Sequence, residues 1–207
     1  MLRYICLGLV IVAGSLADAA EPAEFKVTAH RQDHRSIQLD KSFMAAPMRI
    51  GSKTFKRGLG THANSRTVIE LGKNCKTFKC SIGTDLNDPT RKAGGSVVFI
   101  IKTDGKERYR SKILKPGDEP VAVSVDLAGA RKLELITDVS IKGFTGDHAD
   151  WADARIALTS GKDAYIADQM RRQGPPAKLP APPPRPKTGP VEPETRSLTA
   201  DEAQDQL

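Results

Sequence analysis

The stretch from Asp147 to Ala154 concentrates the side chains of this chain that could do chemistry. It reads Asp-His-Ala-Asp-Trp-Ala-Asp-Ala and holds the only tryptophan. Proteins bind sugars with an aromatic ring over the apolar sugar face and with polar side chains that pair with the hydroxyls. Trp151, flanked by His148 and Asp150, could supply both. The alternative is that Trp151 is a core residue and that the aspartates cap turns or hold a structural cation.

A second stretch, Gly58 to Ser65, reads Gly-Leu-Gly-Thr-His-Ala-Asn-Ser. Its glycines allow a sharp turn that would present His62, and we interpret both stretches as loops that precede strands. Since a rigid sandwich displays chemistry on the loops at its ends, the predicted ligand-binding residues should lie together at one end. They are His62, His148, Asp150 and Trp151. Asp153, just before the last strand, is better placed to hold a loop or a metal ion.

Catalytic motifs are absent from the sequence. The aspartates, His148 and His62 could form a hydrolytic metal centre, but no His-Glu-x-x-His motif supports it. Asp85 begins a segment like an EF-hand loop, but Thr90 and Ser96 stand where that loop needs glycine and glutamate. No Gly-x-Ser-x-Gly motif occurs either. We therefore predict no catalytic residues, with a metal-dependent hydrolase as the weakest alternative.

The elements that must position these residues are strands. Alternating valines at 121, 123 and 125 predict a half-buried strand. Asp104-Gly105 is typical of a tight hairpin turn. Short segments of this kind predict an all-β fold, a two-sheet β-sandwich of the jelly-roll type. The predicted strands are Thr67–Leu71, Thr77–Ile82, Ser96–Lys102, Glu107–Leu114, Val121–Asp126, Lys132–Thr137 and Ala154–Thr159, with weaker candidates at Phe25–Ala29 and Met48–Phe55.

The two ends of the chain differ from this middle part. Residues 1–20 have the pattern of a signal peptide, with Arg3, a short apolar run and Ala17 and Ala19 before a cleavage site; an uncleaved anchor is the alternative. We expect an exported protein (secreted, periplasmic or in the cell envelope) without a membrane span. Nine of the 14 prolines lie between Pro175 and Pro193. They predict a short helix and then a disordered tail over residues 161–207, after a domain over residues 24–160.

The net charge bears on the kind of ligand that the protein could attract, and the cysteines bear on its redox state. The 207-residue chain has a net charge of +7. Basic and acidic residues cancel at both ends, so the excess lies in the domain and could attract an anionic glycan; a solvated lysine-rich surface is the alternative. No nucleic-acid partner is predicted. Cys75 and Cys80 could be two buried thiols or one disulfide.

Several separate motifs in the right order resemble the NPCBM domain, a carbohydrate-binding module found beside family-98 glycoside hydrolases. They are Gly58 to Ala63 with the approach from Arg49, Phe78 to Asp85, Gly95 to Phe99, and Asp147 to Ala154. The resemblance covers Met48 to Leu158.

The resemblance implies a jelly-roll sandwich that binds galactose-type or related sugars, with no required cofactor and, as in some relatives, a structural calcium. Only His62 and the cluster from Asp147 to Asp153 carry over from the family pattern. We therefore predict an exported, non-catalytic carbohydrate-binding protein. The main alternative is a structural or protein-interaction module of the cell envelope with the same fold.

Overall fold

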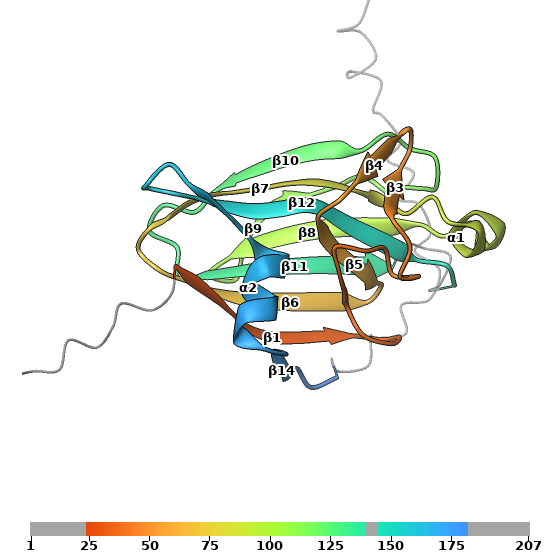
Figure 1. The fold of residues 1–207 in the computed structure, drawn as a ribbon. Coiled ribbons are helices and arrows are strands. Elements are labelled where there is room, and N and C mark those ends of the chain that lie inside the picture. Colours follow the sequence, from red (N-terminus) through yellow and green to blue (C-terminus); the bar gives the residue numbers. More distant parts are fainter. Residues whose placement is uncertain (1–23, 140–144, 182–207) are drawn as a thin grey trace, which may run out of the picture.

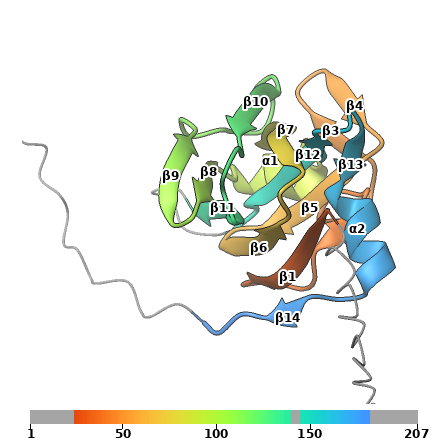
Figure 2. The same ribbon diagram turned by 90° about the vertical axis from the view of Figure 1, so that its left-hand side faces the viewer.

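The computed structural model describes residues 24–139 and 145–181, which form a sandwich of two sheets (Figures 1 and 2). One sheet has the strand order β14-β1-β6-β11-β8-β9 and the other β10-β7-β12-β5-β2, with β13 paired to β12. The strands of the first sheet are β14 (Ala177–Lys178), β1 (Phe25–Gln32), β6 (Ser65–Leu71), β11 (Lys132–Val139), β8 (Val97–Thr103) and β9 (Lys106–Arg110). Those of the second are β10 (Val121–Asp126), β7 (Cys75–Thr84), β12 (His148–Leu158), β5 (Gly58–His62), β2 (Gln38–Leu39) and β13 (Asp163–Tyr165).

The core lies between these two sheets. In β7, Phe78, Cys80 and Ile82 alternate with more exposed residues and are buried, as the period of two predicts. Phe99 from β8 and Trp151 from β12 meet in the same core. The predicted two-sheet β-sandwich is therefore confirmed.

Two segments predicted as loops are strands. Gly58–His62 is β5 and His148–Leu158 is β12, and these strands are direct neighbours in the second sheet. All five residues of β5 and the first five of β12 are buried, so neither segment shows the alternation that marks a half-buried strand. The prediction was wrong here because it depended on that alternation.

The outer face of the second sheet is covered, which explains this burial. The hairpin of β3 (Met48–Ile50) and β4 (Lys53–Phe55) lies across it (Figure 1). Met48 and Ile50 form a second small apolar cluster with Ala152, and Phe55 packs against it. β12 is therefore enclosed between the main core and this cover.

A short helix, α1 (Asp88–Ala93), connects β7 to β8 and was not predicted. Its start is capped by Asn87, whose side chain accepts a hydrogen bond from the backbone nitrogen of Thr90. Gly94, in the left-handed conformation, ends it. Six residues are too few to show helical periodicity, so only these caps could have indicated the helix.

The C-terminal part of the chain packs on the sandwich. The predicted helix is present as α2 (Ile166–Gln173), and it buries Ile166 and Met170. The Gln173 side chain accepts from the backbone nitrogen of Val27 at 3.0 Å and donates to its carbonyl. β14 then pairs in parallel with β1 (Figure 2). The expectation of disorder from about residue 174 is thus wrong for residues 174–181, and the ordered part extends past residue 160; the rest of the predicted tail lies outside the described residues.

The two cysteines of β7 are free, buried thiols, which decides against a disulfide. Cys75 donates to the carbonyl of Glu24 at 2.9 Å, and burial raises the pKa of both thiols. The predicted turn at Asp104-Gly105 joins β8 to β9, with positive φ at both residues. Among the described residues, no helix is long and apolar enough to cross a membrane. The predicted signal peptide lies outside them.

Candidate functional site

His62 and His148 face each other across two neighbouring strands. They are paired in the register of β5 and β12, and their ring centroids lie 5.5 Å apart. His62 is the last residue of β5 and His148 the first of β12, so both lie at the end of the sandwich that also carries α1 (Figure 1). The structure thus brings together the two histidines that the sequence singled out.

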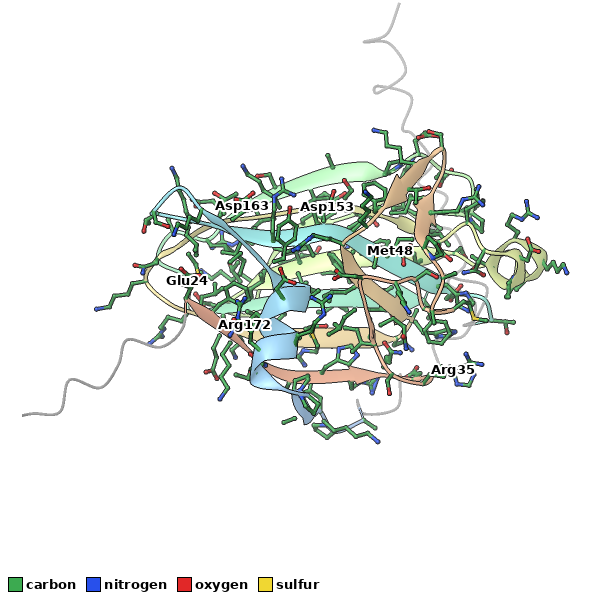
Figure 3. The ribbon with its side chains drawn as sticks, viewed as in Figure 1. Glu24, Arg35, Met48, Asp153, Asp163 and Arg172 are labelled. Carbon is green, nitrogen blue, oxygen red and sulfur yellow. The ribbon has the colours of Figure 1, made fainter. Side chains whose placement is uncertain are left out.

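Two further rings complete this group. Phe43 lies against both histidines, with centroid distances of 4.9 Å to His62 and 4.7 Å to His148. His34 meets His62 edge-on at 5.3 Å. We call His34, Phe43, His62 and His148 the ring cluster. The guanidinium of Arg35 lies over the Phe43 ring at 5.8 Å, at the same end of the molecule (Figure 3).

Neighbouring groups orient the two paired imidazoles. Nδ1 of His62 contacts the carbonyl oxygen of Ala63, which can only accept, so this nitrogen carries the proton. Nδ1 of His148 lies 2.8 Å from the Thr90 hydroxyl, which itself donates to the side-chain oxygen of Asn87. Nδ1 of His148 also lies 3.0 Å from the side-chain nitrogen of Asn87, which can only donate, and 3.2 Å from the side-chain oxygen, so these contacts fit either tautomer of His148. Nε2 of neutral His62 is an acceptor, and among the described residues neither His62 nor His148 makes a hydrogen bond through Nε2.

Burial keeps both rings neutral. It lowers the pKa of His148 to about 4, with smaller contributions from nearby His62 and Arg35. It also lowers the pKa of His62, although the carbonyl of Ala63 acts in the opposite direction. Near neutral pH the site therefore presents two uncharged imidazoles beside an apolar ring.

Trp151 lies on the other face of β12, inside the core. Its side chain is 1% exposed, its ring meets that of Phe99 edge-on at 4.9 Å, and its indole nitrogen donates to the Thr137 hydroxyl at 3.1 Å. Because Trp151 is three residues from His148 on a strand, the two side chains point to opposite faces. The burial favours the core interpretation of Trp151 over a ring that stacks on sugar.

Asp150 shares the outward face of β12 with His148 but lies deeper. It is fully buried, and neither carboxylate oxygen has a hydrogen-bond partner among residues 24–139 and 145–181. Burial, and then the negative charge of Asp85, raise the pKa of its carboxyl well above the usual value. Asp150 is therefore close to the ring cluster along the strand, but it is not on the surface.

Asp153, the predicted metal residue, lies at an irregular position of β12 with a φ of 50° (Figure 3). It lines an open groove of about 340 Å³ that Lys79 and Arg155 also line. The two basic side chains would repel a cation there. Across residues 24–139 and 145–181, no group of three or more His, Cys, Asp or Glu side chains is arranged to hold a metal ion.

Comparison with known families decides what kind of domain carries this site. The family model described as "NPCBM/NEW2 domain" matches residues 21–157. The chain belongs to the NPCBM/NEW2 family. The resemblance inferred from the motifs is thus confirmed, and most of the match falls on the sandwich described above.

Two curated relatives are similar to part of this chain. A Renibacterium salmoninarum protein named "Putative endo-alpha-N-acetylgalactosaminidase" is 34% identical over 116 residues, which cover 55% of this chain and 7% of that protein. The Akkermansia muciniphila protein "Alpha-1,3-galactosidase B" is 30% identical over 125 residues, 59% of this chain and 16% of that protein. The chain thus spans only a small part of either relative.

Solved structures share the NPCBM fold. The structure of CBM51-2 in complex with GlcNAc and INT domains from Clostridium perfringens ZmpB is 25% identical, with a TM-score of 0.60 over 67% of this chain and 31% of that one. The CBM51 module from Clostridium perfringens GH95, in complex with methyl-galactose, is 22% identical with a TM-score of 0.59 over 63% of this chain and 94% of that one.

Sequence reasoning missed several residues of this NPCBM site. His34 and Phe43 belong to none of the motifs above, and both reach the ring cluster from a segment far from β12 in the chain. Asn87 and Thr90 were considered only as part of a rejected calcium loop. The Asn-Asp-Pro-Thr sequence is a typical helix start, and it could have placed α1 beside the histidines.

Proposed function

We propose that this chain is an exported, non-catalytic carbohydrate-binding protein that binds a glycan at the ring cluster. The observation that carries the proposal is the pair His62 and His148, held side by side at this end of the sandwich, with no hydrogen bond to either Nε2 among the described residues. Sugar hydroxyls both donate and accept hydrogen bonds, so two adjacent neutral imidazoles suit two neighbouring hydroxyls of one sugar ring. Membership of the NPCBM/NEW2 family supports this assignment.

The names and titles of the relatives support a class of sugar. One solved neighbour at 25% identity is in complex with GlcNAc, and the two curated relatives are named for N-acetylgalactosaminide and α-1,3-galactoside chemistry. We therefore infer a galactose-type sugar or an N-acetylhexosamine at the end of a glycan. Since the chain spans 7% and 16% of the curated relatives, their hydrolytic activities are not part of the proposal.

The role of Trp151 in this proposal is indirect. Its burial means that no indole face is available for stacking, and Phe43 is buried too, so contacts to the apolar sugar face would come from the exposed His34 ring. Trp151 stabilises β12, the strand that carries His148.

Binding of the full chain to GlcNAc, N-acetylgalactosamine and methyl-galactoside, measured by calorimetry, tests the proposal. We expect at least one of these sugars to bind, and His62→Ala and His148→Ala each to weaken binding about fivefold or more, since a lost hydrogen bond to an uncharged partner is worth about 1 kcal/mol. Lys162→Ala, at an exposed position beyond the far end of β12 from His148, is the matched control and should bind like the wild type. If the folded His62→Ala and His148→Ala variants bound these sugars as tightly as the wild type, the proposed site would be contradicted.

One observation favours a second candidate function. The buried Trp151 fits a structural or protein-interaction module of the cell envelope that uses the fold without a sugar. No binding of the folded wild-type chain to any sugar on a broad glycan array would favour this alternative.

A further inference from the structure

Arg35 places a positive charge on the ring cluster. Its guanidinium lies over the Phe43 ring, 5.8 Å from the centroid, which is within the range of a cation–π contact. The Arg35 side chain is exposed at this end of the sandwich (Figure 3), whereas the Phe43 ring beneath it is buried. Across residues 24–139 and 145–181, no acidic side chain forms an ion pair with Arg35.

The acidic residue closest to Arg35 in sequence is bound to other partners. The carboxylate of Asp33 forms an ion pair with Arg31 at 3.0 Å and accepts a hydrogen bond from the side chain of Asn64 at 2.8 Å. Arg31 is thus neutralised by its neighbour, and Arg35 is not. The guanidinium donors of Arg35 therefore remain available to a ligand.

The backbone holds Arg35 at this place in an unfavourable conformation. Its φ of 50° lies in the left-handed region, which residues with a side chain rarely adopt. The residue before it, His34, packs edge-on against His62. Backbone conformations of this kind concentrate at ligand sites, where the surrounding structure maintains them. The position of Arg35 beside the histidines is therefore fixed by the fold of this segment.

The positive charge of Arg35 reaches the histidine pair. It is one of the causes that lower the pKa of His148, after burial and the neighbouring His62. Both imidazoles are neutral near pH 7, so they neither compensate this charge nor add to it. A ligand held by His62 and His148 would therefore lie close to one fixed cation.

The ligand group that suits this cation is an oxyanion. A guanidinium is planar and binds carboxylate or sulfate oxygens through two parallel hydrogen bonds. Sugars carry both kinds of group, as uronic or sialic acid carboxylates and as sulfate esters. An acidic peptide would offer a carboxylate as well, but it lacks the two neighbouring hydroxyls that suit the imidazole pair. An acidic sugar uses all three side chains together.

We propose that the glycan bound at the ring cluster carries an anionic group, a carboxylate or a sulfate ester, and that Arg35 binds this group while His62 and His148 bind hydroxyls. The inference rests on the proposed function, since it concerns the same site. It differs from the attraction expected from the net charge of the domain, because it assigns the selectivity to a single side chain.

Calorimetry on the full chain, at physiological ionic strength, tests this assignment with matched pairs of ligands. Methyl galactoside is compared with its 3-sulfate, its 6-sulfate and methyl galacturonide, and GlcNAc with its 6-sulfate. We expect at least one acidic sugar to bind roughly tenfold more tightly than its neutral parent, since hydrogen bonds between charged groups are about twice as strong as neutral ones. The sulfated and carboxylated arms show which anion the site prefers.

Variants of equal charge separate Arg35 from the rest of the basic surface. Arg35→Gln should remove the preference for the acidic sugar and leave binding of the neutral parent unchanged. Arg35→Lys keeps the charge without the planar fork and should retain only part of the preference. Arg131→Gln is the matched control, because Arg131 is exposed and precedes β11 at the end of the sandwich opposite the ring cluster. It should keep the full preference.

The outcomes distinguish this inference from the proposed function. If neutral sugars bind through His62 and His148 but no acidic sugar binds more tightly, the inference is overturned and the proposed function stands. The inference is also overturned if Arg35→Gln keeps the preference, or if Arg131→Gln loses it to the same extent. If the folded wild type binds none of these sugars, the proposed function fails and the inference fails with it.

Discussion

The indole nitrogen of Trp151 on β12 donates a hydrogen bond to the hydroxyl of Thr137 on β11, 3.1 Å away. β12 belongs to one sheet and β11 to the other, so this bond joins the two layers from inside the core. The Thr137 hydroxyl also lies 3.3 Å from that of Thr61, which donates to the carbonyl of Ala149. The only tryptophan is therefore part of a buried polar chain directly behind the histidine pair.

Replacing Trp151 should change stability rather than remove a sugar contact. We expect Trp151→Ala to lower the free energy of unfolding by about 3–5 kcal/mol, since it leaves a large cavity. Trp151→Phe should cost less, because it retains an aromatic ring but loses the bond to Thr137. Urea denaturation measures both changes. A stable Trp151→Phe variant that no longer binds sugar would instead indicate that the ring contacts the ligand.

Gly60 should not tolerate a side chain. We expect Gly60→Ala to destabilise the protein strongly, because its Cβ would lie 2.3 Å from the Lys41 carbonyl oxygen. The backbone of residues 41–43 would have to move. Gly94→Ala is a useful comparison, since its φ of 66° is unfavourable for alanine but its Cβ would meet nothing within 4 Å. That control should cost about 1 kcal/mol. If Gly60→Ala and Gly94→Ala lowered the melting temperature equally, residues 41–43 would not be packed on Gly60.

The buried histidines should make stability depend on pH. The pKa of His148 is about 4 in the folded protein and 6.5 in its ordinary state, so between these values the unfolded chain binds a proton that the folded chain does not. Stability contributed by neutral His148 is therefore present above about pH 6.5 and is lost towards pH 4, by about 3 kcal/mol in total.

His148→Gln should remove this part of the pH dependence, as measured by urea denaturation at a series of pH values. His30, whose pKa burial also lowers to about 4, keeps its own contribution in the variant. Asp147 acts in the opposite direction, because burial raises its pKa to about 6. The comparison of variant with wild type isolates His148, and identical pH profiles would contradict its burial as a neutral ring.

The C-terminal segment up to residue 181 should contribute to stability. Truncation after Ser160 removes the buried side chains of Ile166 and Met170 and should lower the free energy of unfolding by about 3–6 kcal/mol. Truncation after Ala181 keeps α2 and β14 and should leave the melting temperature unchanged. If both truncations left it unchanged, α2 would not be packed on the sandwich in solution.

Local patterns determined much of the fold. The alternating valines of β10, the Asp104-Gly105 turn and the capacity of Phe78, Cys80 and Ile82 to share one face depend only on residues close in sequence. They were enough to predict the β-sandwich. The motifs around His62 and His148 identified the family and named the two residues that the structure then pairs.

Tertiary structure alone decided what each residue of the site can reach. Whether Trp151 is exposed or Asp150 is closed off depends on what covers each face of β12. The cover comes from the other sheet on one side and from residues 41–50 on the other, more than 90 positions away in the chain. Alternation of apolar and polar residues arises because one face of a strand is buried and the other is exposed. A strand that is buried on both faces does not show this alternation. The sequence by itself determined which residues matter and which fold carries them; the cover over the second sheet decided that the tryptophan supports the site from behind.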